Sequence, residues 1–246
     1  MSLRIIVNAD DFCYNETATQ KIAEFAERGL VSSTTIMATG ADFARAAEYS
    51  KSRPDISFGV HLALAEVPSL SKNPLLGAAK NMSCWAKGKG FSAAFNSELA
   101  AAVEAEWTLQ IQKCLDFGVK ISHLDSHHGV HTKPFTFLPL KRVAAKFGIK
   151  KVRNIYNLSD TFTARRRLQR ALYETAFRHC PPQFTTTDFF LSYGEFVQMK
   201  NRPDGALIEL MCHPGGVYPE EDAMIEAQTL ASVCKDFRLI NWNDIP

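Results

Sequence analysis

The chain has 246 residues, of which 46% are hydrophobic and 22% are charged, and its formal net charge is +2. This composition is typical of a globular protein with enough apolar material for one large core. It indicates neither a nucleic-acid partner nor a membrane-surface partner, because either would favour a marked excess of positive charge.

Three further features bear on the cellular compartment. No uninterrupted apolar stretch approaches the length of about 18 residues that a membrane span needs. The N-terminal residues lead directly into a strand-like run without an apolar leader. The six cysteines are scattered and form no C-x-x-C pair, which favours reduced thiols over a disulfide framework or a zinc ribbon. We therefore expect a cytoplasmic protein without membrane association.

In chain order, the first segments alternate between strand-like and helix-like patterns. Residues 4–8 form a β-branched run, and residues 15–27 follow with apolar side chains at helical spacing. A Thr/Ile-rich run at 32–38, a helix-like segment at 43–52 and another apolar run at 56–64 continue the pattern.

The rest of the chain resumes this alternation after one irregular segment. Residues 68–90 are polar, contain Gly and Pro and show no period, so we expect a loop or insertion near the functional site. Helices are expected at 97–117, 137–147, 165–179 and 220–234, and short strands at 120–124, 151–155, 206–211 and 238–241.

Such alternation predicts an α/β fold with mostly parallel strands covered by helices. We find no internal repeat and no convincing linker, so one domain over residues 1–246 is the simpler interpretation. In such folds the chemistry gathers at the carboxyl ends of the strands. The ends of the expected strands are therefore the first places to look for a site.

Two of these ends carry ionisable side chains. Asp10 and Asp11 follow the first strand, and adjacent carboxylates repel each other unless a cation neutralises one of them. A solvated turn or a helix N-cap would explain the same pair. His61 lies among apolar residues near the end of the third strand, where a hydrogen-bonded core histidine is the more common explanation.

A histidine cluster follows the fourth strand. Residues 122–131 hold four of the seven histidines, and histidine is the commonest side-chain metal ligand. Asp125 and His127 would point the same way in an extended segment, which suits a carboxylate that orients a ligating imidazole. A polar loop is the alternative for the cluster, and a plain Pro-Gly turn is the alternative for His213, which follows the strand at 206–211.

Each signal is weak alone, but all of them recur at the exit of an expected strand. A site assembled from several strand ends favours an enzyme over a binding module. Carboxylate and imidazole side chains gathered there favour a metal-dependent hydrolase.

The same residues belong to an ordered series of motifs. In chain order these are Val7-Asn8-Ala9-Asp10-Asp11-Phe12, Gly59-Val60-His61-Leu62, His123-Leu124-Asp125-Ser126-His127-His128, Val152-Arg153, Thr187-Asp188-Phe189 and Cys212-His213-Pro214-Gly215. In this order and spacing, the chain resembles the YdjC-like carbohydrate deacetylases, which include the ChbG-type chito-oligosaccharide deacetylases. The similarity runs from residue 4 to about residue 240.

The resemblance implies a deformed, TIM-barrel-like β/α fold. It also implies an enzyme that uses a divalent cation to remove the N-acetyl group from an amino sugar. By position, Asp11, His61 and His127 match the metal ligands of the family. Asp10 matches the general base, and His213 matches the general acid.

Further implications concern supporting residues and partners. Asp125 and Arg153 would lie beside the reacting groups, and Asp188 would be a candidate substrate contact. The resemblance makes Mg²⁺ the first choice of cation, whereas one carboxylate and two imidazoles also suit Zn²⁺, which is the alternative. The expected partner is a small carbohydrate substrate, and a homodimer is a further implication.

Two positions depart from the family pattern. Cys13 stands where Gly is frequent, and Gly129 stands where a third consecutive histidine is common. We interpret Cys13 and Cys212 as packing residues. Trp85, in the irregular segment, is the aromatic side chain that we would watch for stacking on a sugar ring. Two other functions stay open: a metal-dependent amidase or phosphoesterase for another small molecule, and an inactive sugar-binding homologue.

Overall fold

A computed structural model describes residues 2–77, 97–216 and 218–246. Within them, seven strands form one sheet in which every pairing is parallel. The order is β4-β3-β2-β1-β6-β5, and β7 also pairs with β1. The strands are β1 (Leu3–Phe12), β2 (Ser33–Ile36), β3 (Ser57–Leu62), β4 (Ile121–Ser126), β5 (Phe189–Ser192), β6 (Leu207–Cys212) and β7 (Phe237–Leu239).

The central strand is β1, which has neighbours on both sides along its length. Its residues 4–9 pair with β6. On the other side, β7 pairs with residues 3–5 and β2 pairs with the carboxyl-terminal part. The carboxyl end of β1 is therefore held between β2 and β6.

Beyond β4 the sheet continues as isolated bridges. Val152 pairs with Leu124 of β4, and Lys151 pairs with Thr185. The strand expected at 151–155 is thus reduced to two bridged residues, which extend the curled sheet past β4. The expectation of a mostly parallel, deformed β/α barrel is confirmed.

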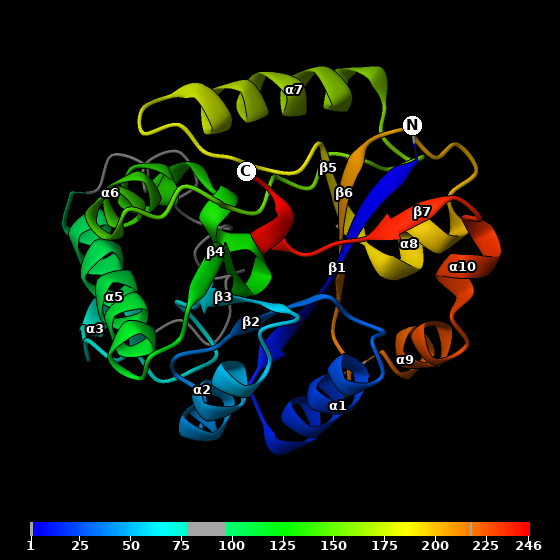
Figure 1. The fold of residues 1–246 in the computed structure, drawn as a ribbon. Coiled ribbons are helices and arrows are strands. Elements are labelled where there is room, and N and C mark those ends of the chain that lie inside the picture. Colours follow the sequence, from blue (N-terminus) through cyan, green and yellow to red (C-terminus); the bar gives the residue numbers. More distant parts are fainter. Residues whose placement is uncertain (1, 78–96, 217) are drawn as a thin grey trace.

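Helices surround the sheet (Figure 1). They are α1 (Glu16–Glu27), α2 (Phe43–Ser52), α3 (Pro74–Gly77), α5 (Ser97–Asp116), α6 (Phe137–Phe147), α7 (Ala164–His179), α8 (Tyr193–Gln198), α9 (Pro219–Glu226) and α10 (Thr229–Val233), with 3₁₀ turns η1 (His127–Thr132), η2 (Pro134–Thr136) and η3 (Trp242–Asp244). Among the described residues, no helix combines the length and the apolar character that a bilayer crossing requires.

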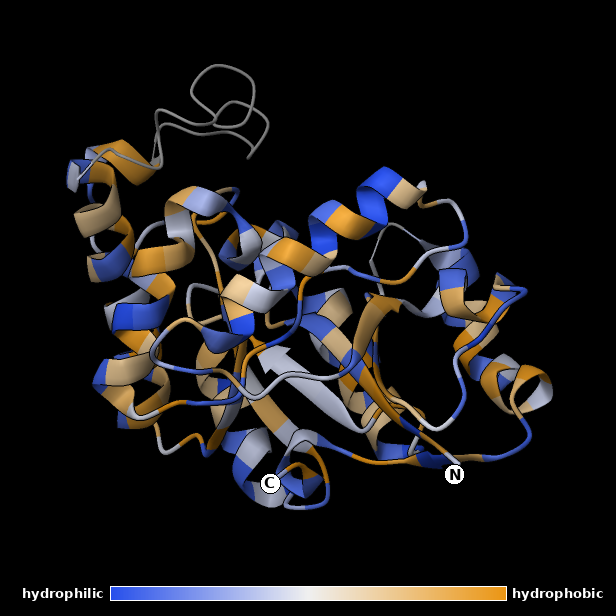
Figure 2. Ribbon diagram, turned by 90° about the horizontal axis from the view of Figure 1, so that it is seen from above, coloured by the Kyte–Doolittle hydropathy of each residue, from blue (hydrophilic) through white to orange (hydrophobic). Residues whose placement is uncertain are grey.

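The first helix illustrates how the sequence produces these elements. The side chain of Asn15 accepts the backbone N–H of Ala18 and so caps the amino end of α1. Ile22 and Phe25 are buried on one face, and Gly29 follows the helix with a φ of 66°. Hydrophobic and hydrophilic residues mix along the helices, as expected of elements with one buried face (Figure 2).

Several boundaries differ from the expectations. The helix expected at 220–234 is two helices, because Gln228 has a left-handed backbone with a φ of 50° between α9 and α10. β5 and α8 carry too few residues to show a period and are absent from the expectations. Of the irregular segment 68–90, residues 68–77 include α3, while the rest, with Trp85, lies outside the described residues.

Candidate metal and catalytic site

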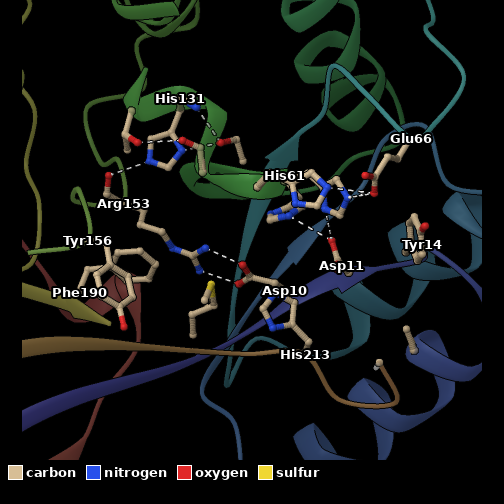
Figure 3. A pocket seen from close by; sticks show the side chains of 18 of the residues that line it. Asp10, Asp11, Tyr14, His61, Glu66, His131, Arg153, Tyr156, Phe190 and His213 are labelled. Carbon is tan, nitrogen blue, oxygen red and sulfur yellow. Dashed lines mark hydrogen bonds and ion pairs between the residues drawn. The ribbon is translucent and has the colours of Figure 1, made fainter. Parts of the chain in front are cut away.

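The carboxyl ends of the strands surround a pocket of about 660 Å³. Asp11 lies near the end of β1, His61 on β3, and His127 directly after β4. His213 follows β6. The pocket thus gathers side chains from four strands that are distant in the sequence (Figure 3).

One carboxylate and two imidazoles converge at one side of this pocket. The Oδ1 atom of Asp11 lies 2.9 Å from Nδ1 of His127 and 3.2 Å from Nε2 of His61. Burial alone would raise the pKa of Asp11, but the hydrogen bonds to His127 and His61 hold it well below its usual range. The Asp11 carboxylate is therefore ionised at neutral pH and can serve as an anionic ligand.

The end of β1 is irregular, and this irregularity separates the two adjacent carboxylates. The register of β1 against β2 shifts after Ala9, and Asp11 has a positive φ of 67°. A bulge of this kind changes the direction in which side chains point, and the positive φ at a non-glycine residue strains the backbone locally. As a result, Asp10 faces Arg153 whereas Asp11 faces His61 (Figure 3).

The ring of His61 is oriented from behind by Asp125. Nδ1 of His61 lies 2.8 Å from Oδ1 of Asp125, and the hydroxyl of Thr35 donates to Oδ2 of Asp125 at 3.0 Å. Burial alone would lower the pKa of His61, but Asp125 and Asp11 raise it well above its usual value. A carboxylate behind an imidazole fixes its orientation and so directs Nε2 toward a ligand site.

Arg153 is a buried cation that contacts three carboxylates. It donates two hydrogen bonds of 2.7 Å to Asp10 and one of 3.0 Å to Glu209, and its Nη1 lies 2.8 Å from Oδ2 of Asp125. Burial would raise the pKa of Asp10, but Arg153 lowers it to about 2. At Glu209 burial prevails and raises the pKa to about 7. Asp10 is therefore ionised and held in one orientation by a bidentate ion pair.

His213 is the imidazole that faces the pocket after β6. Its backbone N–H donates to Oε2 of Glu221 at 2.9 Å, and its Nδ1 lies 3.8 Å from the same atom. Burial would lower the pKa of His213, but Glu221 and the carboxylates of Asp10 and Asp11 raise it above the usual value. The site therefore pairs an imidazole whose charged form is favoured with an ionised carboxylate.

Ligand atoms suitable for a cation meet in three clusters of the described residues. These are Asp11–His61–His127, Glu66–His127–His128 and Asp10–His61–Asp125. Arg153 already neutralises the third cluster, and two exposed side chains contribute to the second. In the first cluster, the described residues place no Lys or Arg in an ion pair with Asp11, and its Oδ1 atom lies within 3.2 Å of a ring nitrogen of both His61 and His127. This set fits a divalent cation best.

The structure brings together most of the residues expected from the sequence. Around the pocket lie Asp10, Asp11, His61, Asp125, His127, Arg153 and His213. Asp188 is placed differently: it precedes β5, is exposed, and accepts the backbone N–H of Leu207 at 2.9 Å. Both residues lie at the amino ends of their strands, so the position of Asp188 does not support a substrate contact.

The two other buried histidines of the cluster serve the structure. His131 lies 2.6 Å from Oγ of Ser126 and 3.1 Å from the carbonyl oxygen of Arg153, and burial lowers its pKa to about 3. His123 stacks on Trp242 with ring centroids 4.5 Å apart. Neither belongs to a cluster of ligand atoms among the described residues.

Sequence reasoning missed several partners of the site residues. They are Thr35, Glu66, Glu209 and Glu221. Only Glu209 carries a signal in the sequence, because it is a charged residue within the apolar strand β6. The interpretation of the two nearby cysteines as packing residues agrees with their burial, which raises the pKa of both the Cys13 and the Cys212 thiols.

Comparison with known proteins identifies the family. Residues 4–240 match the family of YdjC-like proteins. The chain belongs to this family. Among its YdjC-like relatives, a carbohydrate deacetylase of Geobacillus stearothermophilus is 30% identical over 224 residues, which cover 85% of this chain and 78% of the relative. A carbohydrate deacetylase of Clostridium beijerinckii is 28% identical, over 99% of this chain and 100% of that protein.

A solved structure supports the fold of this YdjC-like protein. It comes from Enterococcus faecalis V583 and is described as a candidate cellobiose-phosphate cleavage protein. It matches with a TM-score of 0.71 and 23% identity, over 99% of this chain and 98% of that chain.

Proposed function

We propose that this protein is a metal-dependent carbohydrate deacetylase that hydrolyses the N-acetyl group of an amino sugar and releases acetate. The observation that carries the proposal is the set Asp11, His61 and His127, which lies in one pocket with an ionised Asp10 and with His213, whose pKa is raised. The relatives named carbohydrate deacetylases support the sugar as the substrate.

Asp10 would act as the general base. Arg153 keeps it ionised, and its Oδ2 atom, which accepts one hydrogen bond from Arg153, has a second lone pair for the proton of a water molecule. Its low pKa makes it a weak base in isolation, so the water must be made more acidic. A divalent cation held by Asp11, His61 and His127 would supply this Lewis-acid chemistry and would also polarise the acetyl carbonyl.

His213 would act as the general acid. An amine leaves an amide carbon readily only when its nitrogen is protonated, and the raised pKa of His213 favours the protonated ring that can supply this proton. Glu221 holds the backbone of His213 in place and favours the charged ring. The expected base, Asp10, thus lies beside a cation, whereas the expected acid, His213, lies beside carboxylates.

Aromatic side chains at the pocket would contact the sugar. Tyr14 and Tyr218 line the pocket and are exposed. The Tyr14 ring stacks against that of His127, with centroids 5.7 Å apart and ring planes inclined by 28°. An aromatic face beside the reacting groups suits the apolar face of a sugar ring.

Acetate release from N,N′-diacetylchitobiose and N-acetylglucosamine, with Mg²⁺ or Zn²⁺ added, tests the activity. We expect Asp10→Asn to lower kcat by about 10²–10⁴-fold, as for loss of a general base. Asp116→Asn, at an exposed position on α5, is the matched control and should keep the wild-type rate. If no N-acetyl sugar releases acetate while another amide or a phosphoester is hydrolysed, the proposed substrate is wrong.

Metal analysis tests the ligand set without any activity assay. We expect His61→Ala to lose most of the bound divalent cation, because it removes one of the three ligands and empties the position that Asp125 supports. His179→Ala, at an exposed position of α7, should bind as much metal as the wild type. An unchanged metal content in His61→Ala would refute the ligand assignment.

A further inference from the structure

Helix α7 is amphipathic, but its apolar side faces away from the protein. Ala164, Leu168, Leu172 and Thr175 follow one another at intervals of three or four residues, so they lie along one side of the helix, and all four are exposed. Leu168 is 63% exposed and Leu172 is 65% exposed, more than any other large hydrophobic side chain among the described residues. The helix lies at the edge of the molecule, at the top of Figure 1. We call these four residues the outer face of α7.

The opposite side of α7 makes the contacts with the rest of the protein, and much of that contact is polar. Glu174 accepts hydrogen bonds from the side chains of Asn154 and Asn157 at 2.7 and 3.0 Å. Phe177 is the one buried residue of the helix. Leu168 and Leu172 belong to neither apolar cluster of the described residues. The outer face therefore adds nothing to the core of its own protein.

Positive charge is concentrated on the same helix. Five arginines and one glutamate give α7 a net charge of +4, so the rest of the chain, whose total is +2, has a net charge of −2. Arg165, Arg166 and Arg167 stand in the first turn, which has no acidic residue, although the amino end of a helix favours negative charge. None of the ion pairs within the described parts of the chain includes these three arginines. An anionic surface would supply the missing counter-charge.

Charge and area distinguish the possible occupants of the outer face. A second copy would bring two helices of net charge +4 together, which like-charge repulsion disfavours. A stable protein interface buries about 800 Å² on each partner, and two leucines with two small side chains supply only a minor part of that. A helix at a bilayer surface needs less: apolar side chains that enter the boundary of the acyl chains, and arginines on both sides that reach the headgroups. Arg165 and Arg167 flank the outer face in this way.

We propose that the outer face of α7 binds the surface of an anionic lipid bilayer, with Leu168 and Leu172 inserted at the acyl boundary and Arg165 and Arg167 at the lipid phosphates. The composition predicts no such partner, because the net charge of the whole chain is small, but the structure gathers the required charge on one helix. Arg170 lines the pocket from this same helix, so the bound protein would hold its pocket close to the headgroups. Binding of this kind does not depend on the deacetylase activity.

Co-sedimentation with vesicles tests the proposal. Vesicles of phosphatidylglycerol and phosphatidylcholine in equal parts should bind the protein at least tenfold more strongly than vesicles of phosphatidylcholine alone, because each arginine near an anionic surface contributes about fivefold. High salt should weaken the binding, because it screens the charge of the lipids. Equal binding to both kinds of vesicle, or no binding to the anionic vesicles, would overturn the proposal.

Two variant pairs locate the binding on α7. Leu172→Gln should weaken binding to the anionic vesicles about tenfold, because it removes an inserted apolar side chain. Leu138→Gln, at a leucine of α6 that is 57% exposed, is its control and should bind like the wild type. Arg165→Gln should weaken the binding about fivefold, whereas Lys235→Gln removes an exposed charge outside α7 and should not. If the two members of either pair weaken the binding equally, the outer face of α7 is not the binding surface.

Two further measurements distinguish other occupants. Sedimentation equilibrium without vesicles reports on a second copy: a dimer that Leu172→Gln dissociates would overturn the proposal, because a second copy would then cover the outer face. Calorimetry with an acidic amphipathic peptide reports on a protein partner: binding of the peptide without binding to anionic vesicles would assign the face to an acidic protein instead. Binding to the vesicles but not to the peptide, with an oligomeric state that Leu172→Gln leaves unchanged, would uphold the bilayer as the partner.

Discussion

At the scale of single residues, the acid–base properties of the site depend on neighbours that lie far away in the sequence or in another element. Glu221 is an example, because it belongs to α9 and yet sets the environment of His213 at the end of β6. Its Oε2 atom accepts the backbone N–H of His213 and lies 3.8 Å from Nδ1 of the ring. One carboxylate thus both positions the expected acid and favours its charged form.

Replacing this carboxylate should shift the pH dependence of the enzyme. In Glu221→Gln the amide oxygen can still accept the backbone hydrogen bond, but the negative charge is lost, so the pKa of His213 falls. Because His213 must be protonated to donate, the alkaline limb of kcat/KM should move to lower pH, by about one unit. Glu220→Gln, at the exposed neighbouring position, is the control. A limb that stays in place in Glu221→Gln would contradict the role of His213 as the acid.

A second residue-scale prediction concerns stability and uses Glu209. Burial raises the pKa of Glu209 from 4.5 to about 7 in spite of Arg153. Between these pH values the folded protein keeps a proton that the unfolded chain releases, so this residue makes the folded state less stable as the pH rises.

Glu209→Gln removes this titration. The free energy of unfolding of the variant, relative to the wild type, should therefore rise between pH 4.5 and 7, by at most about 1.4 kcal/mol per pH unit. Urea denaturation at several pH values measures it, with the half-buried Glu104→Gln variant on α5 as the control. A constant difference between Glu209→Gln and the wild type would show that Glu209 titrates in the ordinary range.

At the scale of elements, α7 is fixed to the body of the protein largely at its carboxyl end. Phe177 is the one residue of α7 that is buried. Below it, Nζ of the buried Lys141, on α6, donates to the carbonyl oxygens of Phe177, Cys180 and Pro182 at 2.7, 2.9 and 2.7 Å. A single ammonium group therefore satisfies three carbonyls where α7 ends.

Lys141→Met should destabilise the protein by about 2–3 kcal/mol, because the methionine fills the space but leaves these carbonyls without their donor. Arg142→Met, which removes only an exposed ion pair with Glu104, should change the stability by less than about 0.5 kcal/mol. Urea denaturation of both variants is the measurement. If Lys141→Met were as stable as Arg142→Met, water would replace the ammonium group of Lys141 as the donor without a cost in stability.

The elements also show what the sequence could and could not reveal. Long periodic segments such as α5 were predictable, because a buried face repeats over five turns or so. β5 has four residues and the bridge at Lys151 and Val152 has two, which is too short for any period. Their place is set by the neighbours with which they pair, and pairing partners cannot be read from local sequence.

The same limit applies to the site. The position of His61 in an apolar strand favours a core residue, and nothing local shows that Asp11 and Asp125 lie on either side of its ring. The series of motifs shared with the family predicts a ligand set, whereas the partners Thr35 and Glu221 are identified by tertiary contacts alone.

At the scale of the whole molecule, the two ends of the sheet have different tasks. The carboxyl ends of the strands form the pocket, whereas the C-terminal segment closes the amino ends. There, Trp242 packs with Ile6, Leu207, Ile240 and Ile245 in a separate apolar cluster. This division predicts that stability and activity can be changed independently.

The backbone of the C-terminal segment is fixed to the sheet at the same end. The N–H of Trp242 donates to Oγ of Ser57 at 3.1 Å, and Nζ of Lys151 donates to the carbonyl oxygens of Trp242 and Ile245. These contacts join β3 and the bridge after β4 to the end of the chain. Trp242 is thus fixed by its backbone as well as by the packing of its ring.

Trp242→Ala should therefore lower the free energy of unfolding by about 3–5 kcal/mol, because it opens a large cavity at a fully buried position. Trp242→Phe should cost less, because Nε1 of Trp242 has no hydrogen-bond partner to lose among the described residues. Asn243→Ala, at an exposed position, is the control. Under conditions where all variants remain folded, acetate release per molecule should match the wild type, because Trp242 lies at the end of the strands away from the pocket. A loss of activity in folded Trp242→Phe would show instead that the two ends of the sheet are coupled.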